Sequence, residues 1–101
     1  MKIAFSTSGG DLNAPLDTRF GRAAKFLVYD TETKQSTIVD NAQNLAAAQG
    51  AGIQSAQAVA AAGAQALVSG HCGPKAFRVL DAAGVAVYTA DAATVGEALA
   101  L

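Results

Sequence analysis

The sequence predicts an α/β fold with a mixed five-stranded sheet and helices on both faces. Three observations lead to this prediction. Short apolar runs alternate with segments of helical periodicity, in the order β-β-β-α-β-α-β-α. The early strands are close enough for a hairpin, whereas the later ones are separated by helices, as in crossover units. At 101 residues, 51% of them hydrophobic, the chain suits a single domain, 1–101, with a core of small side chains.

The first half of the chain is expected to form strands at 2–7, 24–30 and 36–41. The first run, KIAFST, stops at Ser8-Gly9-Gly10, and the second, AKFLVYD, is rich in β-branched and aromatic residues. The polar stretch 31–35 is short, which predicts a hairpin between the second and third strands.

The spacing of apolar residues then changes to that of a helix. This helix is expected at about 52–62 and is expected to end at Gly63. Its core face is expected to carry Ile53, Ala56, Val59 and Ala60. Its outer face is expected to carry Gln54, Ser55 and Ala58. The apolar run that follows, 64–70, is typical of a parallel strand covered by helices on both sides.

The last third of the chain adds two helices and a strand. Pro74 at the first helical position and Gly84 after the last turn predict a helix over 74–83. A strand is expected at 85–89. The spacing of Thr94 and Glu97 is that of a capping box opening a short final helix.

This order of elements makes strands one, three, four and five parallel if strand two is antiparallel to its neighbours. The segments that follow these four strands would then meet at one edge of the sheet, where open α/β sheets bind ligands. They are 8–23, 42–51, 70–73 and 90–93.

Charge and composition exclude several classes of protein. The net charge of −1 and the pI of about 5.6 argue against a general nucleic-acid binder. A single cysteine excludes an intrachain disulfide and fits a reducing compartment. Because no apolar run approaches the length of a membrane span and the N-terminus lacks a signal peptide, we expect a cytoplasmic protein with no membrane partner.

The first connecting segment, SGGDLNAPLDTRFGR, is long for so small a domain and carries Arg19 and Arg22. Two guanidinium groups with a glycine between them suit an anion, through charge and through close backbone N–H groups. The alternative is structural: Phe20 anchors the loop in the core, and the arginines are solvated or paired with Asp17 and Asp11.

The only histidine and the only cysteine, His71 and Cys72, are adjacent in VSGHCGPKAF. Since Pro74 opens the next helix, Cys72 or Gly73 becomes the helix cap, where backbone amides and the helix dipole favour a thiolate or a bound anion. The alternative is a buried inert thiol beside a histidine bonded to the backbone.

One cysteine and one histidine are too few to cage a bare zinc ion. A metal–sulfide cluster brings its own sulfide ligands and negative charge, so the protein need supply only a few anchors, cations and N–H donors. Thiolate and imidazole ligands suit Cu(I), Fe–S or Mo–S species better than Mg²⁺ or Ca²⁺.

Two other classes remain open at this point. Cys72 and Arg78 have the Cys-x5-Arg spacing of cysteine phosphatases and some arsenate reductases. Helical phase, however, groups Arg78 with Lys75 and Asp81, opposite a core face of Ala76, Leu80 and Ala83, so we expect Arg78 to face solvent. The other class is a cofactor-free module whose exposed loops bind a protein.

Several segments together resemble the dinitrogenase iron–molybdenum cofactor biosynthesis family, which includes nitrogenase cofactor carriers and the orange protein of sulfate reducers. They are TRFGRAAKFLVYD, DN, GAG, SGHCGPKAFRVLDAAGVAVY and TVGEAL. The resemblance implies a ribonuclease H-like three-layer sandwich. It also implies a non-enzymatic carrier of a preformed Mo/Cu or Fe/Mo sulfide cluster, acting in storage, assembly or delivery.

The resemblance also implies a set of cofactor-binding residues: Thr18, Arg19, Gly21, Arg22, Asn41, Gly70, His71, Cys72 and Gly73. Cys72 and His71 are the expected metal anchors, Arg19 and Arg22 the charge partners, and the amides of 70–73 the donors to sulfur. A protein recipient or assembly partner is expected, and a homodimer could share one cluster.

Overall fold

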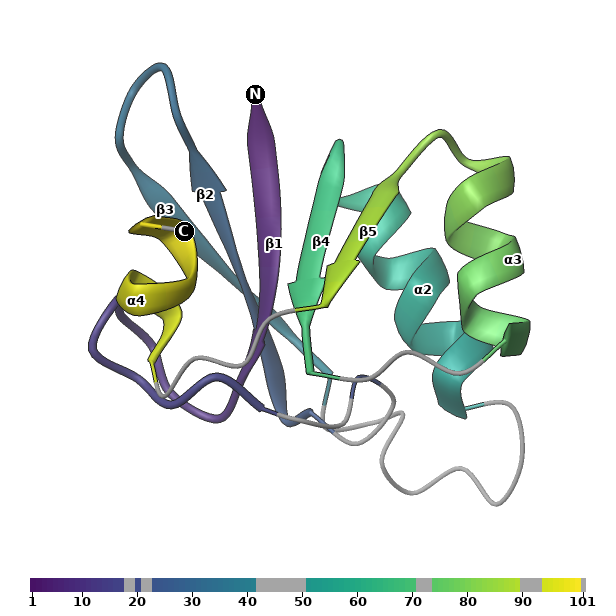
Figure 1. Ribbon diagram of the computed structural model, residues 1–101, viewed down its shortest axis with the longest axis horizontal. Coiled ribbons are helices and arrows are strands. Elements are labelled where there is room, and N and C mark those ends of the chain that lie inside the picture. Colours follow the sequence, from purple (N-terminus) through teal and green to yellow (C-terminus); the bar gives the residue numbers. More distant parts are fainter. Residues whose placement is uncertain (18–19, 21–22, 42–50, 71–73, 90–93, 101) are drawn as a thin grey trace.

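The computed structural model describes residues 1–17, 20, 23–41, 51–70, 74–89 and 94–100 (Figure 1). The strands are β1 (Lys2–Thr7), β2 (Lys25–Asp30), β3 (Ser36–Asp40), β4 (Ala66–Ser69) and β5 (Ala86–Thr89). The helices are α2 (Ala51–Ala61), α3 (Pro74–Ala82) and α4 (Val95–Ala100). The order is the one expected from the sequence.

The five strands form one mixed sheet in the order β3-β2-β1-β4-β5. β2 is antiparallel to β1 and β3, while β4 is parallel to β1 and β5. Strands β1, β3, β4 and β5 therefore run in one direction, as predicted. We call the edge at which these four strands end the carboxyl edge; it is the lower edge of the sheet in Figure 1.

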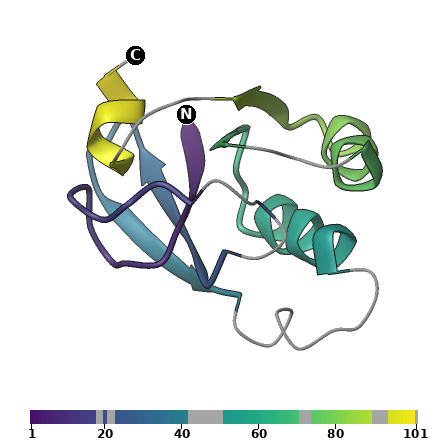
Figure 2. The same ribbon diagram turned by 60° about the horizontal axis from the view of Figure 1, so that its bottom comes forward.

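Helices cover both faces of the sheet, which confirms the predicted layers (Figures 1 and 2). Neighbouring side chains of a strand point to opposite faces. On β2, Phe26 packs in the cluster that contains residues of α2 and α3, whereas Leu27 packs in the cluster with α4. On β1, Ala4 packs in the first of these clusters and Phe5 in the second. The sheet thus separates two small hydrophobic cores and contributes side chains to both.

The final helix, α4, is held at its start by side-chain and backbone acceptors. Thr94 Oγ1 accepts a hydrogen bond from Glu97 N at 3.2 Å, so Thr94 caps α4 as its spacing predicted. The N–H of Gly96 donates to the carbonyl of Leu12 at 2.7 Å, and a Cβ at Gly96 would lie only 3.0 Å from that oxygen. The connection after β1 therefore packs directly against α4.

Two predictions about helix faces were wrong. Ser55, expected on the outer face of α2, is fully buried, because its hydroxyl has a partner in the interior. Ala83, expected on the core face of the next helix, is exposed because α3 ends at Ala82. The core positions Ala56 and Val59 of α2 are buried as predicted.

Candidate functional site

The predicted site residues fall into two groups in the structure. Asn41 and Gly70 are described. The others lie outside the described residues: Thr18, Arg19, Gly21, Arg22, His71, Cys72 and Gly73. Their described neighbours show where the two segments that carry them leave the fold.

Those two segments start from positions that touch. The backbone N–H of Gly70, which precedes His71, donates to the carbonyl of Asp17, which precedes Thr18, at 3.5 Å. The Ser6 hydroxyl donates to the same carbonyl at 2.9 Å, and its oxygen lies 2.9 Å from the Ser69 hydroxyl oxygen. We call the group of Ser6, Asp17, Ser69 and Gly70 the edge junction. It joins the ends of β1 and β4 to the first connection at the carboxyl edge.

Phe20 belongs to the segment that carries Arg19 and Arg22, which we call the basic segment, and it packs in the core. Its side chain is 1% exposed, and its ring centroid lies 5.2 Å from that of Phe26. The Ala23 N–H donates to the Phe20 carbonyl at 3.3 Å. The predicted anchoring role of Phe20 is confirmed, so both arginines flank, in sequence, a residue with a fixed place in the fold. Solvation or pairing of the arginines stays a prediction.

Asn41 is fully buried, and its amide bonds to the protein. Its Nδ2 donates to the Ala23 carbonyl at 2.8 Å, and its Oδ1 accepts from the Ser55 hydroxyl at 3.2 Å. Its backbone N–H donates to the Ala24 carbonyl at 2.9 Å. Asn41 therefore ties the start of β2 to α2 and supports the end of the first connection. Contact between Asn41 and a cofactor stays a prediction.

The helix that follows the His71-Cys72 pair in sequence begins at Pro74, as predicted. Its first turn contains no acidic residue, so the helix itself does not neutralise the positive end of its dipole. Arg78 is exposed together with Lys75 and Asp81, while Ala76 and Leu80 are buried. This confirms the predicted exposure of Arg78 and gives the phosphatase hypothesis no support.

Sequence reasoning missed the edge junction and the bond between Asn41 and Ser55. A signal for the junction was present, because the apolar runs KIAFST and AQALVSG each place a serine near the carboxyl end of a strand. The bond between Asn41 and Ser55 spans 14 residues and has no comparable local pattern.

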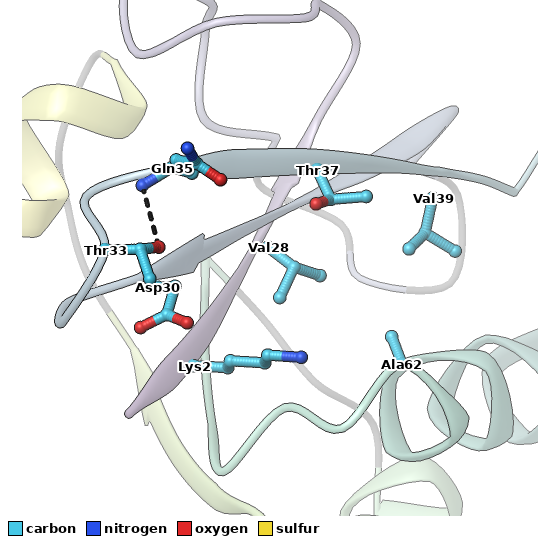
Figure 3. Close-up of a pocket in the computed structure, with 8 residues that line it drawn as sticks. All are labelled: Lys2, Val28, Asp30, Thr33, Gln35, Thr37, Val39 and Ala62. Carbon is cyan, nitrogen blue, oxygen red and sulfur yellow. Dashed lines mark hydrogen bonds between the residues drawn. The ribbon is translucent and has the colours of Figure 1, made fainter.

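A cavity of about 440 Å³ lies at the other end of the sheet, where β1 begins (Figure 3). It is lined by Lys2, Val28, Asp30, Thr33, Gln35, Thr37, Val39 and Ala62. The side chain of Lys2 extends toward the end of α2, and Asp30 accepts a hydrogen bond from Glu32 N at 2.9 Å. The Asp30 carboxylate thus has a structural role in the turn that follows β2.

A second cavity, of about 380 Å³, follows β1, β4 and β5 on the face that carries α4. Its lining is mainly apolar: Met1, Ile3, Phe5, Ala66, Val68, Tyr88, Thr89, Ala98 and Leu99. Apart from the N-terminal amine of Met1, these residues contribute no charge to bind an anion.

Within the described residues, no group of three His, Cys, Asp or Glu side chains is placed to hold a metal ion. That part of the chain therefore does not form a site for a bare ion. The described residues also include no helix long and apolar enough to cross a membrane.

Two solved structures are closely similar to this chain. The apo form of the orange protein from Desulfovibrio gigas has a TM-score of 0.94 and 42% identity, covering 98% of this chain and 83% of that one. A Thermotoga protein proposed to be a NifB protein has a TM-score of 0.85 and 36% identity, covering 98% and 84%.

The sequence comparisons agree with the structural ones. An uncharacterised protein of Methanocaldococcus jannaschii is 33% identical over 105 residues, covering 100% of this chain and 84% of its own length. The profile of the family described as dinitrogenase iron-molybdenum cofactor matches residues 1–101. The chain therefore belongs to the dinitrogenase iron–molybdenum cofactor family.

Proposed function

We propose that this protein binds and carries a preformed anionic metal–sulfur cluster and catalyses no reaction on it. The observation that carries the proposal is the hydrogen bond between Gly70 and Asp17 at the carboxyl edge. It brings together the starts of the segment with Arg19 and Arg22 and the segment with His71 and Cys72. Membership of the family and the likeness to the orange protein support the same function.

The chemistry of the two segments suits such a cargo. Cys72 and His71 serve as anchors, because thiolate and imidazole are good ligands for soft metals. Arg19 and Arg22 balance the negative charge of the cluster, and the amides of 70–73 donate to its sulfur atoms. The cluster supplies its own sulfide ligands, so these few protein groups are enough.

The finer parts of the proposal rest on the likeness to the family and on the lone thiol. The cargo is of the Mo/Cu or Fe/Mo sulfide type, and the lone thiol suits a reducing cytoplasm. A carried cluster must also be delivered, so a recipient or assembly protein is part of the proposal. The strand order and layers are in keeping with a ribonuclease H-like sandwich, which we adopt as the working fold.

Anaerobic reconstitution tests the proposal. The protein is mixed with tetrathiomolybdate and Cu(I), or separately with iron and sulfide, then desalted and examined by absorption spectroscopy and metal analysis. We expect a coloured species that stays with the wild-type protein in a fixed metal-to-protein ratio. If neither mixture leaves metal on the desalted protein, the carrier function is wrong.

Variants of the proposed anchors define the site. Cys72→Ser and His71→Ala are expected to retain less cluster while keeping the wild-type circular dichroism spectrum. Arg78→Ala is the matched control, because Arg78 is exposed on α3, and should retain the cluster as the wild type does. Full retention by both anchor variants would remove the pair from the site.

A further inference from the structure

We propose that the buried hydroxyl pair of Ser6 and Ser69 holds Asp17 and Gly70, from which the two cluster-binding segments start, as one unit, and that retention of the cluster depends on this unit. The proposal rests on the carrier function proposed above. It assigns Ser6 and Ser69 as positioning residues, since they act through Asp17 and Gly70 and do not themselves touch the cargo.

The geometry of the pair is that of a closed hydrogen-bond chain. Ser6 is on β1 and Ser69 on β4, the neighbouring parallel strand, and the two are 0% and 1% exposed. Their hydroxyl oxygens lie 2.9 Å apart, and the Ser6 oxygen lies 2.9 Å from the Asp17 carbonyl oxygen. With the single proton of Ser6 directed at that carbonyl, the proton between the hydroxyls comes from Ser69.

The Asp17 carbonyl is the point where the two segments meet. It accepts from the Ser6 hydroxyl at 2.9 Å and from the Gly70 N–H at 3.5 Å. The Asp17 N–H in turn donates to the Ser6 carbonyl at 2.8 Å. A shift of Asp17, which leads into the basic segment, would therefore be transmitted to Gly70, which leads into His71 and Cys72.

Stability alone does not account for serine at these two positions. Other positions on the same strands, Phe5 and Leu67 among them, are apolar and fully buried, although Thr7 next to Ser6 is buried and polar. Two alanines would remove both partners of the bond between the hydroxyls, which is nearly neutral for stability. They would also remove the Ser6 donor to the Asp17 carbonyl, but that carbonyl keeps the Gly70 N–H as a donor, so we expect the double variant to fold. What the hydroxyls add is a directional contact that fixes the relative positions of two connections.

The hydrogen-bond chain predicts that Ser6→Ala weakens retention of the cluster more than Ser69→Ala does. Ser69→Ala leaves the bond from Ser6 to Asp17 in place. Ser6→Ala removes both bonds and leaves the Ser69 hydroxyl buried without its partner, which is the costlier outcome. Because the two hydroxyls act through one hydrogen-bond chain, the double variant should retain as much of the cluster as Ser6→Ala does.

The first test measures retention of the tetrathiomolybdate and Cu(I) cargo by wild type, the two single variants and the double variant. Each is assayed at a temperature where circular dichroism shows it folded, and retention is expressed per folded molecule. We expect Ser69→Ala to weaken retention by roughly threefold and Ser6→Ala by up to roughly tenfold. Val85→Ala, which creates a cavity in the core at the far end of β5, is the control for lost stability and should retain the cargo fully.

The second test uses amide NMR spectra of the metal-free proteins, which do not depend on the carrier function. Ser69→Ala is expected to shift the resonances of residues around Asp17 as well as those around Gly70. Shifts confined to the neighbours of residue 69 in β4 and β5 would overturn the proposed coupling, as would wild-type retention in both single variants. If the wild type binds no cluster but the coupled shifts are seen, the coupling stands and the carrier function fails.

Discussion

The amide of Asn41 is fully buried between the start of β2 and α2, and both of its polar ends are bonded there. Asn41→Ala would remove the donor to the Ala23 carbonyl and the acceptor for Ser55. We expect it to lower the free energy of unfolding in urea by about 1–3 kcal/mol, because buried groups lose their partners. Asn13→Ala, at an exposed position, is the control. Equal values for the two variants would show that the amide does not hold these segments.

Asp30 stabilises the hairpin between β2 and β3 through its carboxylate. The hydrogen bond from Glu32 N, above all, and also that from Thr33 N and the charges of the N-terminus and Lys2, hold the pKa of Asp30 below its ordinary value of 3.8. Since the folded-state pKa is the lower one, this stabilisation is present above the unfolded-state pKa. It is lost as the pH falls through the folded-state pKa.

Urea unfolding of wild type and Asp30→Asn between about pH 6 and pH 3 measures this effect. We expect the wild type to be the more stable at pH 6 and its advantage to shrink as the pH falls. Asp81→Asn is a control, because Asp81 is an exposed carboxylate on α3, away from the hairpin. An advantage over Asp30→Asn that stays constant with pH would contradict the assignment.

At the scale of residues, the sequence predicted burial well where it depends on apolar pattern and poorly where it depends on a distant partner. Leu80 and Val59 are buried as their helical spacing predicts. Ser55 is buried against that pattern, because its partner Asn41 lies 14 residues away. Periodicity assigns a polar residue to the outer face and carries no information on such a partner.

Among the elements, α4 depends most on its cap, because it has only six residues. Thr94→Ala removes the acceptor of the Glu97 N–H and should cost about 0.5–2 kcal/mol in urea unfolding. Thr94→Ser keeps a hydroxyl at the cap and should stay close to wild type. If Thr94→Ala and Thr94→Ser were equally stable, the cap would contribute nothing.

Element bounds were predictable because local residues set them. The predicted strand 2–7 coincides with β1, and the helix from Pro74 begins where the structure has α3. Gly63 and Gly84, which follow α2 and α3, have φ of 83° and 80°, the left-handed conformation that glycine adopts most readily after a helix. Such signals lie within a few residues of the boundary they mark.

The position of each strand in the sheet was harder to predict. The run VAVYT is apolar, yet β5 lies at an edge and its Tyr88 is 57% exposed. The order of strands depends on pairings between distant segments, and the apolar pattern of one strand does not contain them. The gathering of four strand ends at the carboxyl edge was nevertheless predictable, because it follows from strand direction alone.

For the molecule as a whole, Phe20 links the first connection to the core formed with α2 and α3. Phe20→Ala should lower the free energy of unfolding by about 3–5 kcal/mol, because it leaves a large cavity beside Phe26. Phe77→Ala, whose side chain is 47% exposed on α3, is the matched control and should change stability far less. A small loss for Phe20→Ala would show that the connection does not depend on this anchor.

In the function proposed above, the segments after Asp17 and Gly70 form one binding site at the carboxyl edge. The most direct measurement is amide NMR of the protein before and after loading with the tetrathiomolybdate and Cu(I) cargo. We predict shifts at Asp17, Phe20, Gly70 and the first turn of α3, with Lys2 and the β2–β3 hairpin unchanged. If loading shifted only the resonances of residues that line the cavity at Lys2, or only those beside one of the two segments, a single site at the carboxyl edge would be contradicted.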